Sequence, residues 1–320
     1  MHFGRIQLSV LEDVPQPLKG LLKSNQLEAR SFGDNIQWYN SALAFTSLGA
    51  NFDTSVLQGG GPYDLKLHGE LYHKHSPLIP DEGSEGSYAQ LYIYDAEDAL
   101  DQRVSRNCSL SSNVMSDLQE MLLEHNPFVI IYRQAAERLR EQSRSSTETV
   151  DIQACLVYLP HTDPKRYNIP NVTNEIAIIL SGDGTTTDPC DIIVQLKGGP
   201  FRHVFDTQPA YMPLHYVLLF PRGELGWHQD IPYTDWREAS ANHRVTQLQY
   251  YAYRLFQRQG EATTILRSGK LFQQFIVDTW AAAEQSRLWY IKQNRSRLRA
   301  ERSSSSYGSM GIIRLGPLLR

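Results

Sequence analysis

The chain has 320 residues, carries a formal net charge of −4 and is 41% hydrophobic. A chain of this length forms one large domain or a few smaller ones, and its hydrophobic content is high enough to build a core, which excludes a disordered protein. The longest apolar runs have about five residues, whereas a bilayer-spanning helix needs roughly 18, so no transmembrane helix is predicted.

The first residues and the cysteines indicate the kind of cellular compartment in which the protein is expected. Charged residues and prolines interrupt the first twenty positions, so the apolar segment of a secretory signal is not expected there. Cys108, Cys155 and Cys190 are odd in number, and none stands in C-x-x-C spacing. This pattern argues against a disulfide framework and a thiolate zinc site, and it fits a reducing compartment.

Charge is distributed unevenly along the chain. From Arg287 onward there are eight basic residues and one acidic residue, whereas the preceding 286 residues contain 23 basic and 34 acidic residues. The last part of the chain therefore carries +7 and the rest −11. Such an asymmetry indicates a polyanion-facing end on an otherwise acidic body.

The first part of the chain holds an early element and a pair of predicted strands. The early element is expected at Asn35–Leu48. Apolar and polar residues alternate over Tyr63–Leu71, which predicts a half-buried strand. After a loop at Ser76–Gly86, a second strand is predicted at Tyr88–Tyr94, and we expect it to pair with the first.

Two helices are predicted next along the chain. Apolar residues between Val114 and Leu122 fall on one face of a helix. Asn126 and Pro127 suit the N-cap and first position of the next helix, in which apolar residues recur at helical intervals. The two segments predict an α-helical hairpin or a kinked pair, and a polar stretch at Gln142–Thr149 separates this pair from the middle of the chain.

The middle of the chain is predicted to be rich in strands, and the end to be helical. The strand candidates are Gln153–Leu159, Glu175–Leu180, Asp191–Leu196 and Arg202–Phe205. From Thr246 the pattern becomes helical, and no Gly or Pro stands between Gly269 and Gly308, which predicts one long or two joined helices over residues 270–302. We therefore expect an α+β fold with mixed or antiparallel sheet elements, an α-helical hairpin and a long basic helix at its end.

One cluster of residues has the composition of a metal site. His68, Glu70, His73 and His75 are close in sequence, but strand alternation places the first two and the last two on opposite faces. Convergence on one metal would then need a bulge. We expect these residues to be solvent-facing polar side chains at a strand end, and we predict no metal ligand.

Two groups of tyrosines offer rings that could stack on nucleic-acid bases. They are Tyr88, Tyr92 and Tyr94, and Tyr250, Tyr251 and Tyr253. Since tyrosine is also common in half-buried strands, the core interpretation is favoured for both groups.

The basic end supplies the candidate nucleic-acid-binding residues, namely Arg287, Lys292, Arg295, Arg299 and Arg302. On a continuous helix the last four are spaced three, four and three, so they would form one stripe able to follow a phosphate backbone. The stripe lies beside an apolar row of Leu288, Ile291 and Leu298. The alternative is an ordinary solvated helix face, and charge alone does not separate the two.

Several segments in a fixed order resemble one known family. They are Asn40–Gly49 (NSALAFTSLG), Gly69–His73 (GELYH), Tyr88–Asp95 (YAQLYIYD), Asn126–Val129 (NPFV), Arg166–Pro170 (RYNIP), Ala210–His228 (AYMPLHYVLLFPRGELGWH) and Leu271–Asp278 (LFQQFIVD). Together they resemble Helitron helicase-like proteins, the transposases of eukaryotic rolling-circle transposons, over about residues 4–301. The resemblance implies a nuclear protein of DNA transposition, whose full-length members couple a Rep-type nuclease to an ATP-driven helicase.

The chain departs from that family in its catalytic motifs. Its single H-x-H is His73-Lys74-His75, far upstream of the expected metal motif, and G-x-x-x-x-G-K-[ST] does not occur. We therefore expect an N-terminal transposase fragment that binds DNA, without catalytic, cofactor or metal residues of its own. The expected division is an N-terminal α+β region over 1–240 with a candidate break near 142–150, a helical family domain starting over 241–302, and a divergent or disordered tail over 303–320.

Two further expectations concern partners. A non-enzymatic protein-interaction or scaffold module is the alternative to DNA binding. A helix face comprising Phe272, Phe275, Ile276 and Trp280 is expected to be partly uncovered, which predicts self-association. No membrane association is expected.

Overall fold

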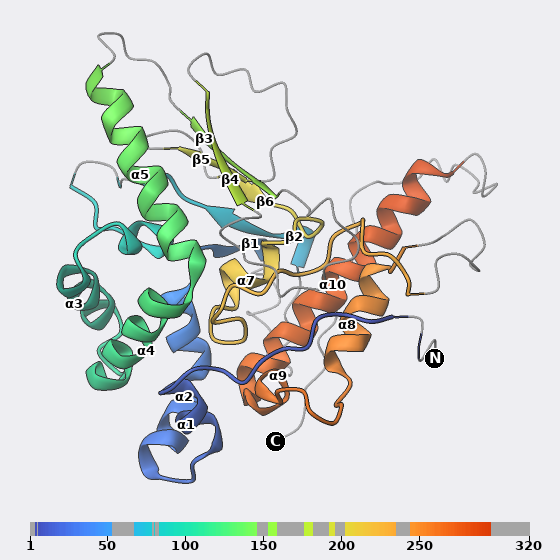
Figure 1. Ribbon diagram of the computed structural model, residues 1–320, viewed down its shortest axis with the longest axis horizontal. Helices are drawn as coiled ribbons and strands as arrows, with labels where there is room; N and C mark the ends of the chain where they lie inside the picture. The colour runs from blue at the N-terminus through green and yellow to red at the C-terminus, as the bar shows by residue number, and fades with distance from the viewer. Residues whose placement is uncertain are drawn as a thin grey trace, which may run out of the picture.

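Figure 1 shows the computed structural model of the protein. The structure describes residues 6–52, 67–78, 83–145, 153–158, 176–181, 192–195, 202–234 and 244–295, together with Gly4 and Pro80. Over these residues the protein is mostly helical, with nine α-helices and short antiparallel strands. No helix within the same ranges is both long enough and apolar enough to span a bilayer.

Two helices begin the fold. α1 (Leu18–Lys23) is followed by α2 (Leu27–Leu43). On α2 the buried residues Phe32, Ile36 and Tyr39 recur at intervals of four and three, so one face of the helix turns toward the core.

The element expected at Asn35–Leu48 is divided between a helix and a strand. α2 ends at Leu43, and β1 (Ser47–Phe52) begins four residues later. The backbone N–H of Phe45 donates to the carbonyl of Leu214 at 2.8 Å, a long-range bond that takes the chain out of the helix. The expected boundaries were therefore wrong, because a partner distant in sequence sets them.

β2 (Leu67–His75) is the central strand of a three-stranded antiparallel sheet. It pairs with β1 on one side and β6 (Arg202–Val204) on the other. The strand expected at Tyr63–Leu71 is thus confirmed over 67–71 and continues to His75, while residues 63–66 lie outside the described residues.

The second strand expected at Tyr88–Tyr94 is wrong, because this segment forms a 3-10 helix, η2 (Tyr88–Tyr92). The backbone N–H of Ser87 donates to the Gln90 side chain at 2.7 Å, and this cap starts the helix. The Tyr92 hydroxyl donates to a backbone carbonyl at the end of α2 at 2.5 Å. Both edges of β2 are already paired, so the apolar side chains of η2 fill the core instead.

Three helices come after η2: α3 (Ala96–Arg106), α4 (Ser112–His125) and α5 (Pro127–Ser145). α4 and α5 form the predicted helical hairpin. The Asn126 side chain accepts a hydrogen bond from the backbone N–H of Phe128 at 3.0 Å, as expected of an N-cap. α5 continues to Ser145, into the expected break near 142–150, and residues 146–150 lie outside the described residues.

A second antiparallel sheet has the order β4-β3-β5. Its strands are β3 (Gln153–Tyr158), β4 (Ile176–Ser181) and β5 (Ile192–Gln195), and each lies within or next to a stretch for which a strand was predicted.

The last part of the fold is helical, and the helices that come after Thr246 were predicted from the sequence pattern. It comprises α7 (Tyr211–His215), α8 (Gln247–Leu255), α9 (Thr264–Arg267) and α10 (Gly269–Gln293). α10 packs against α2, α8 and β2 and then leads away from the core (Figure 1). The expected tail over 303–320 lies outside the described residues.

The core brings together segments that are far apart in sequence. Fully or almost fully buried members include Phe32 of α2, Leu118 of α4, Phe128 of α5, Leu214 of α7 and Phe275 of α10. Because each helix contributes one apolar face, the position of α10 is fixed by the packing of the whole body.

Candidate nucleic-acid interface

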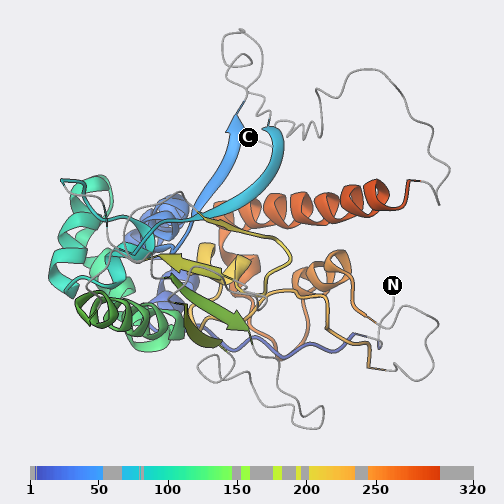
Figure 2. The same cartoon turned by 90° about the horizontal axis from the view of Figure 1, so that it is seen from above.

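α10 has two parts that differ in burial. In the first part Leu271, Phe275 and Ala282 lie on one helical face and are buried in the core. In the second part, from Arg287 to Gln293, every residue is exposed. Figure 2 shows the reason, since the end of α10 extends past the body of the protein.

The exposed end of α10 is unusually apolar. Leu288, Trp289, Tyr290 and Ile291 are 43%, 64%, 49% and 47% exposed. Four consecutive residues point in four directions round an α-helix, so apolar side chains surround this turn. A helix that is apolar on all sides is normally buried. This end therefore has the character of a contact surface for a ligand or partner.

Three of the five predicted DNA-binding residues are described, and all are exposed at this end. Arg287 forms an ion pair with Glu284, with 2.6 Å between Nη1 and Oε1. Lys292 lies in the last turn of α10, and Arg295 lies in the turn that comes after it. Arg299 and Arg302 lie outside the described residues.

Of the two alternatives predicted for residues 270–302, one long helix or two joined helices, the single unbroken helix is not present, and residues 296–302 lie outside the described residues. α10 ends at Gln293, and the backbone N–H and the side-chain amide of Asn294 donate to the Tyr290 carbonyl at 3.0 and 2.9 Å. Asparagine competes in this way for the last carbonyls of a helix and commonly ends it. The three-four-three stripe therefore does not continue on α10 beyond Lys292.

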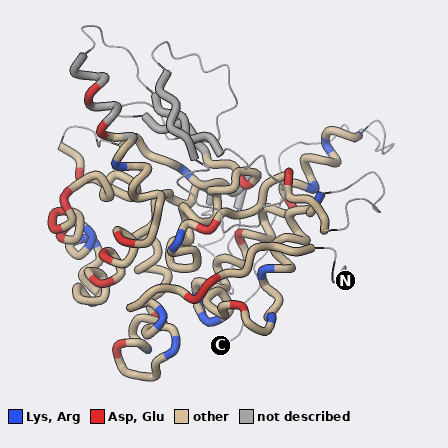
Figure 3. The backbone as a smooth tube through the Cα atoms, viewed as in Figure 1, with Lys and Arg blue, Asp and Glu red and all other residues tan. Residues whose placement is uncertain are grey.

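Charged residues of both signs lie on most parts of the described molecule. Figure 3 shows acidic positions on α3, with basic positions among them, and basic positions on the outer part of α10. On α3, Glu97, Asp98 and Asp101 are exposed. The exposed acidic residues of α3 thus lie apart from the basic residues at the outer end of α10 (Figure 1).

The helix face that was expected to be uncovered has some residues that are covered and others that are exposed. Phe275 is completely buried, and Phe272 is half-buried against the core, so the prediction was wrong for Phe275. Ile276 and Trp280 are 36% and 54% exposed. Phe275 is covered because it faces Tyr216, whose ring centroid lies 5.2 Å away.

His73 and His75 are buried rather than solvent-facing, which corrects the expectation for this cluster. His73 Nε2 lies 3.0 Å from a carboxylate oxygen of Asp278 on α10, and the His75 ring stacks on Tyr132 at 5.3 Å. The two histidines alternate with Tyr72 and Lys74, so they share one face of β2, and Tyr211 and Tyr132 cover that face. Among the residues that the structure describes, no group of three or more His, Cys, Asp or Glu is arranged to hold a metal ion.

The burial of these groups changes their acidity. Burial lowers the pKa of His75 to about 4. Burial and the neighbouring charge of His73 lower the pKa of His215 to about 3. For Asp278, burial alone would raise the pKa, but the charge of His73 and hydrogen bonds from His73 and Tyr211 outweigh it and hold that pKa below its ordinary value.

The tyrosine groups considered for base stacking lie mainly in the core. Tyr92, Tyr250 and Tyr251 are buried, which excludes them as stacking platforms. The Tyr253 ring is covered by the guanidinium of Arg258, which lies 3.6 Å from the ring centroid. Two exposed rings that lie among the predicted basic residues are Trp289 and Tyr290, for which the sequence signal is an adjacent Trp-Tyr pair inside a basic segment.

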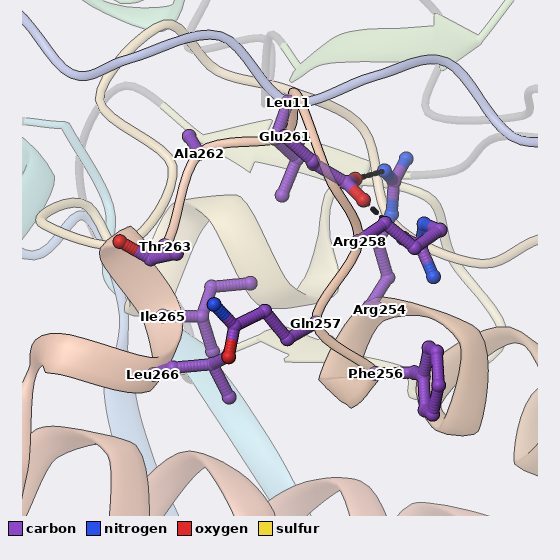
Figure 4. Close-up of a pocket in the computed structure, with 10 residues that line it drawn as sticks. All are labelled: Leu11, Arg254, Phe256, Gln257, Arg258, Glu261, Ala262, Thr263, Ile265 and Leu266. Carbon is purple, nitrogen blue, oxygen red and sulfur yellow. Dashed lines mark hydrogen bonds and ion pairs between the residues drawn. The ribbon is translucent and has the colours of Figure 1, made fainter.

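A pocket lies where the N-terminal segment passes α8 and α9 (Figure 4). Its charged lining residues pair with one another, because both Arg254 and Arg258 contact Glu261. Arg254 also donates to the Ser9 carbonyl at 2.6 Å. This arrangement joins residues near the N-terminus to the helices that lead into α10.

The described fold thus defines a mostly helical protein with a projecting basic and aromatic helix end. A family model described as the Helitron helicase-like domain at the N-terminus matches residues 250–307. The match begins in α8, includes α9 and α10, and confirms the resemblance over these residues. It implies that this segment originates from a transposable element. No curated protein matches the chain.

Proposed function

We propose that this chain is a DNA-binding part of a Helitron-type transposition system, with the outer end of α10 as its contact surface. The observation that carries the proposal is the coincidence of exposed Trp289 and Tyr290 with Arg287, Lys292 and Arg295 within the family match. Basic groups neutralise phosphates, and aromatic rings stack on bases. A role in DNA transposition would place the protein in the nucleus.

The charge distribution supports this choice of surface. The exposed acidic residues on α3 would repel DNA, and the basic end of α10 would attract it (Figure 3). The proposal keeps the α+β class for the chain as a whole, which is supported by separate helical groups and small antiparallel sheets.

A salt titration tests the proposal. Binding of the full chain to labelled single-stranded and duplex DNA is measured by fluorescence anisotropy between low and physiological salt. The test variant replaces all five candidate residues, Arg287, Lys292, Arg295, Arg299 and Arg302, by Gln. If all five contact phosphates, the slope of log affinity against log salt should be about −4.5 on duplex DNA and about −3.5 on single strands, and it should flatten in the variant.

A matched control changes the net charge equally at another place. It replaces five exposed or half-exposed basic residues by Gln, namely Lys19, Lys23, Arg30, Arg244 and Arg267. We expect this control to keep most of the affinity and the salt slope. The proposal would be refuted if DNA affinity did not depend on salt, or if the test variant and the charge control bound DNA with equal affinity.

A protein-interaction or scaffold module is the second candidate function. It is favoured by Trp280 and Trp289, two large apolar side chains that are more than half exposed. A second copy of the chain is one such partner. Sedimentation velocity over a wide concentration range, with and without nuclease treatment, separates the two functions, because self-association that survives the nuclease supports this one.

A further inference from the structure

The first part of α10 contributes to a buried polar cluster that the DNA-binding proposal does not use. Asp278 accepts hydrogen bonds from the Tyr211 hydroxyl at 2.9 Å and the Tyr216 hydroxyl at 3.0 Å. His73 Nε2 lies 3.0 Å from the same carboxylate. The cluster joins β2, the α7 segment and α10 at one point in the core.

The ring of His73 lies between two hydrogen-bond acceptors. Its Nδ1 lies 3.0 Å from the backbone carbonyl of Tyr211, which can only accept. Its Nε2 faces Asp278, whose carboxylate also accepts from two tyrosines. Only an imidazolium can donate from both ring nitrogens, so two acceptors in these positions favour the protonated ring. Two hydroxyl donors on Asp278 favour its ionised form and so disfavour the neutral acid paired with a neutral imidazole.

The surroundings of the ring fit a cation. His73 stacks on Tyr211 with 3.8 Å between centroids and a 4° angle between planes, an arrangement that stabilises a positive ring. His215 stacks on its other side at 4.3 Å and donates through Nδ1 to the Thr46 carbonyl at 3.1 Å. The other titratable groups near the pair are Tyr216, Tyr251 and Asp206. Asp278 is thus the carboxylate in direct contact with His73.

We propose that His73 is held as an imidazolium whose ion pair with Asp278 sets the docking of α10, so that loss of one proton from His73 loosens this helix. Deprotonation at Nε2 turns a donor into an acceptor that faces a carboxylate, and the carbonyl of Tyr211 still needs the proton on Nδ1. The attraction then becomes repulsion inside the core, where charges are weakly screened. The inference holds whether or not α10 binds DNA.

Nitrogen NMR of the full chain labelled with 15N-histidine tests the protonation state directly. The His73 signals are assigned through their contacts with the Tyr211 ring. We expect both ring nitrogens to carry a proton in the folded protein. We also expect amide protection of α10 between Leu271 and Ala283 to fall when Nε2 loses its proton. An unprotonated Nε2 in the folded protein, or α10 protection that does not change when His73 loses a proton, would overturn the proposal.

Two variants separate the ion pair from simple packing. Asp278→Asn offers an amide donor to Nε2, so His73 should become neutral in this variant. His73→Gln leaves Asp278 buried without its cation, and protection in α10 should fall roughly tenfold to a hundredfold. The double variant should recover part of that loss, whereas additive losses would refute the pairing. If His73→Gln does not fold, the nitrogen signals of the parent and Asp278→Asn still decide the question.

Discussion

Replacement of His75 should remove a defined part of the acid sensitivity of this protein. His75 is buried, and its pKa is lowered by burial from about 6.5 to about 4, so the folded state keeps it neutral. Below pH 6.5 His75 binds a proton in the unfolded chain but stays unprotonated in the folded chain. Stability from this group is therefore complete above the unfolded pKa and is lost as the pH falls toward the folded one.

The size of this loss of stability is set by the pKa of His75 in the unfolded chain and by its pKa in the folded chain. Between pH 7.5 and pH 5 the His75 contribution to the free energy of unfolding falls by about 2 kcal/mol. A net stability of about 5 to 15 kcal/mol is usual, so this is a sizeable fraction. His215, with its pKa lowered to about 3, should lose about the same amount over this interval.

The assay compares urea unfolding of the parent and His75→Phe at pH 7.5 and pH 5. Phenylalanine keeps a ring to stack on Tyr132 and cannot titrate. The loss of stability on acidification should be smaller in the variant by about 2 kcal/mol, because all other titrating groups are common to both proteins and cancel. His125→Gln, at the half-exposed end of α4, is the control and should behave as the parent does. Equal acid losses in His75→Phe and the parent would refute the reasoning.

Three substitutions test the packing and the exposed end. Phe275→Ala should reduce the free energy of unfolding by about 3 to 5 kcal/mol, because the ring is completely buried, and a loss below about 1 kcal/mol in urea titrations would contradict this placement. Asn40→Ala should cost about 2 to 4 kcal/mol in the same assay, because its side chain bonds the His215 carbonyl at 2.8 Å and the Leu218 N–H at 3.2 Å, and both groups would be left buried and unpaired. Trp289→Ala should change stability by less than about 0.5 kcal/mol while weakening DNA binding by about 1 to 3 kcal/mol in anisotropy titrations. Unchanged binding would remove Trp289 from the proposed surface.

Features with local causes were predictable from the sequence. The α4 and α5 hairpin results from apolar periodicity and from Asn126, whose cap contacts a residue two positions away. The strands β3, β4 and β5 correspond to short apolar runs between turn-rich segments. The basic segment after Arg287 is a property of composition alone.

Features with distant causes were not predictable. Tyr88–Tyr92 has the composition of a strand but forms η2, because the edges of β2 are already paired with β1 and β6. His73 and His75 have the spacing of exposed strand-end residues, yet the face of β2 that carries both of them is covered by the core. Sequence spacing describes which residues share a face of an element, and it carries no information about what lies against that face.

The sequence by itself determined that a basic end follows an acidic body and that this end begins on a long helix. The tertiary structure decided which part of this helix is free for contact. Phe275 is buried and Trp289 is 64% exposed on the same helix, because the body of the protein covers the first part of α10 and not the second. The tertiary structure also decided which residue pairs with Asp278. His73 lies 205 positions away in the sequence, and the packing of β2 against α10 brings the two side chains together.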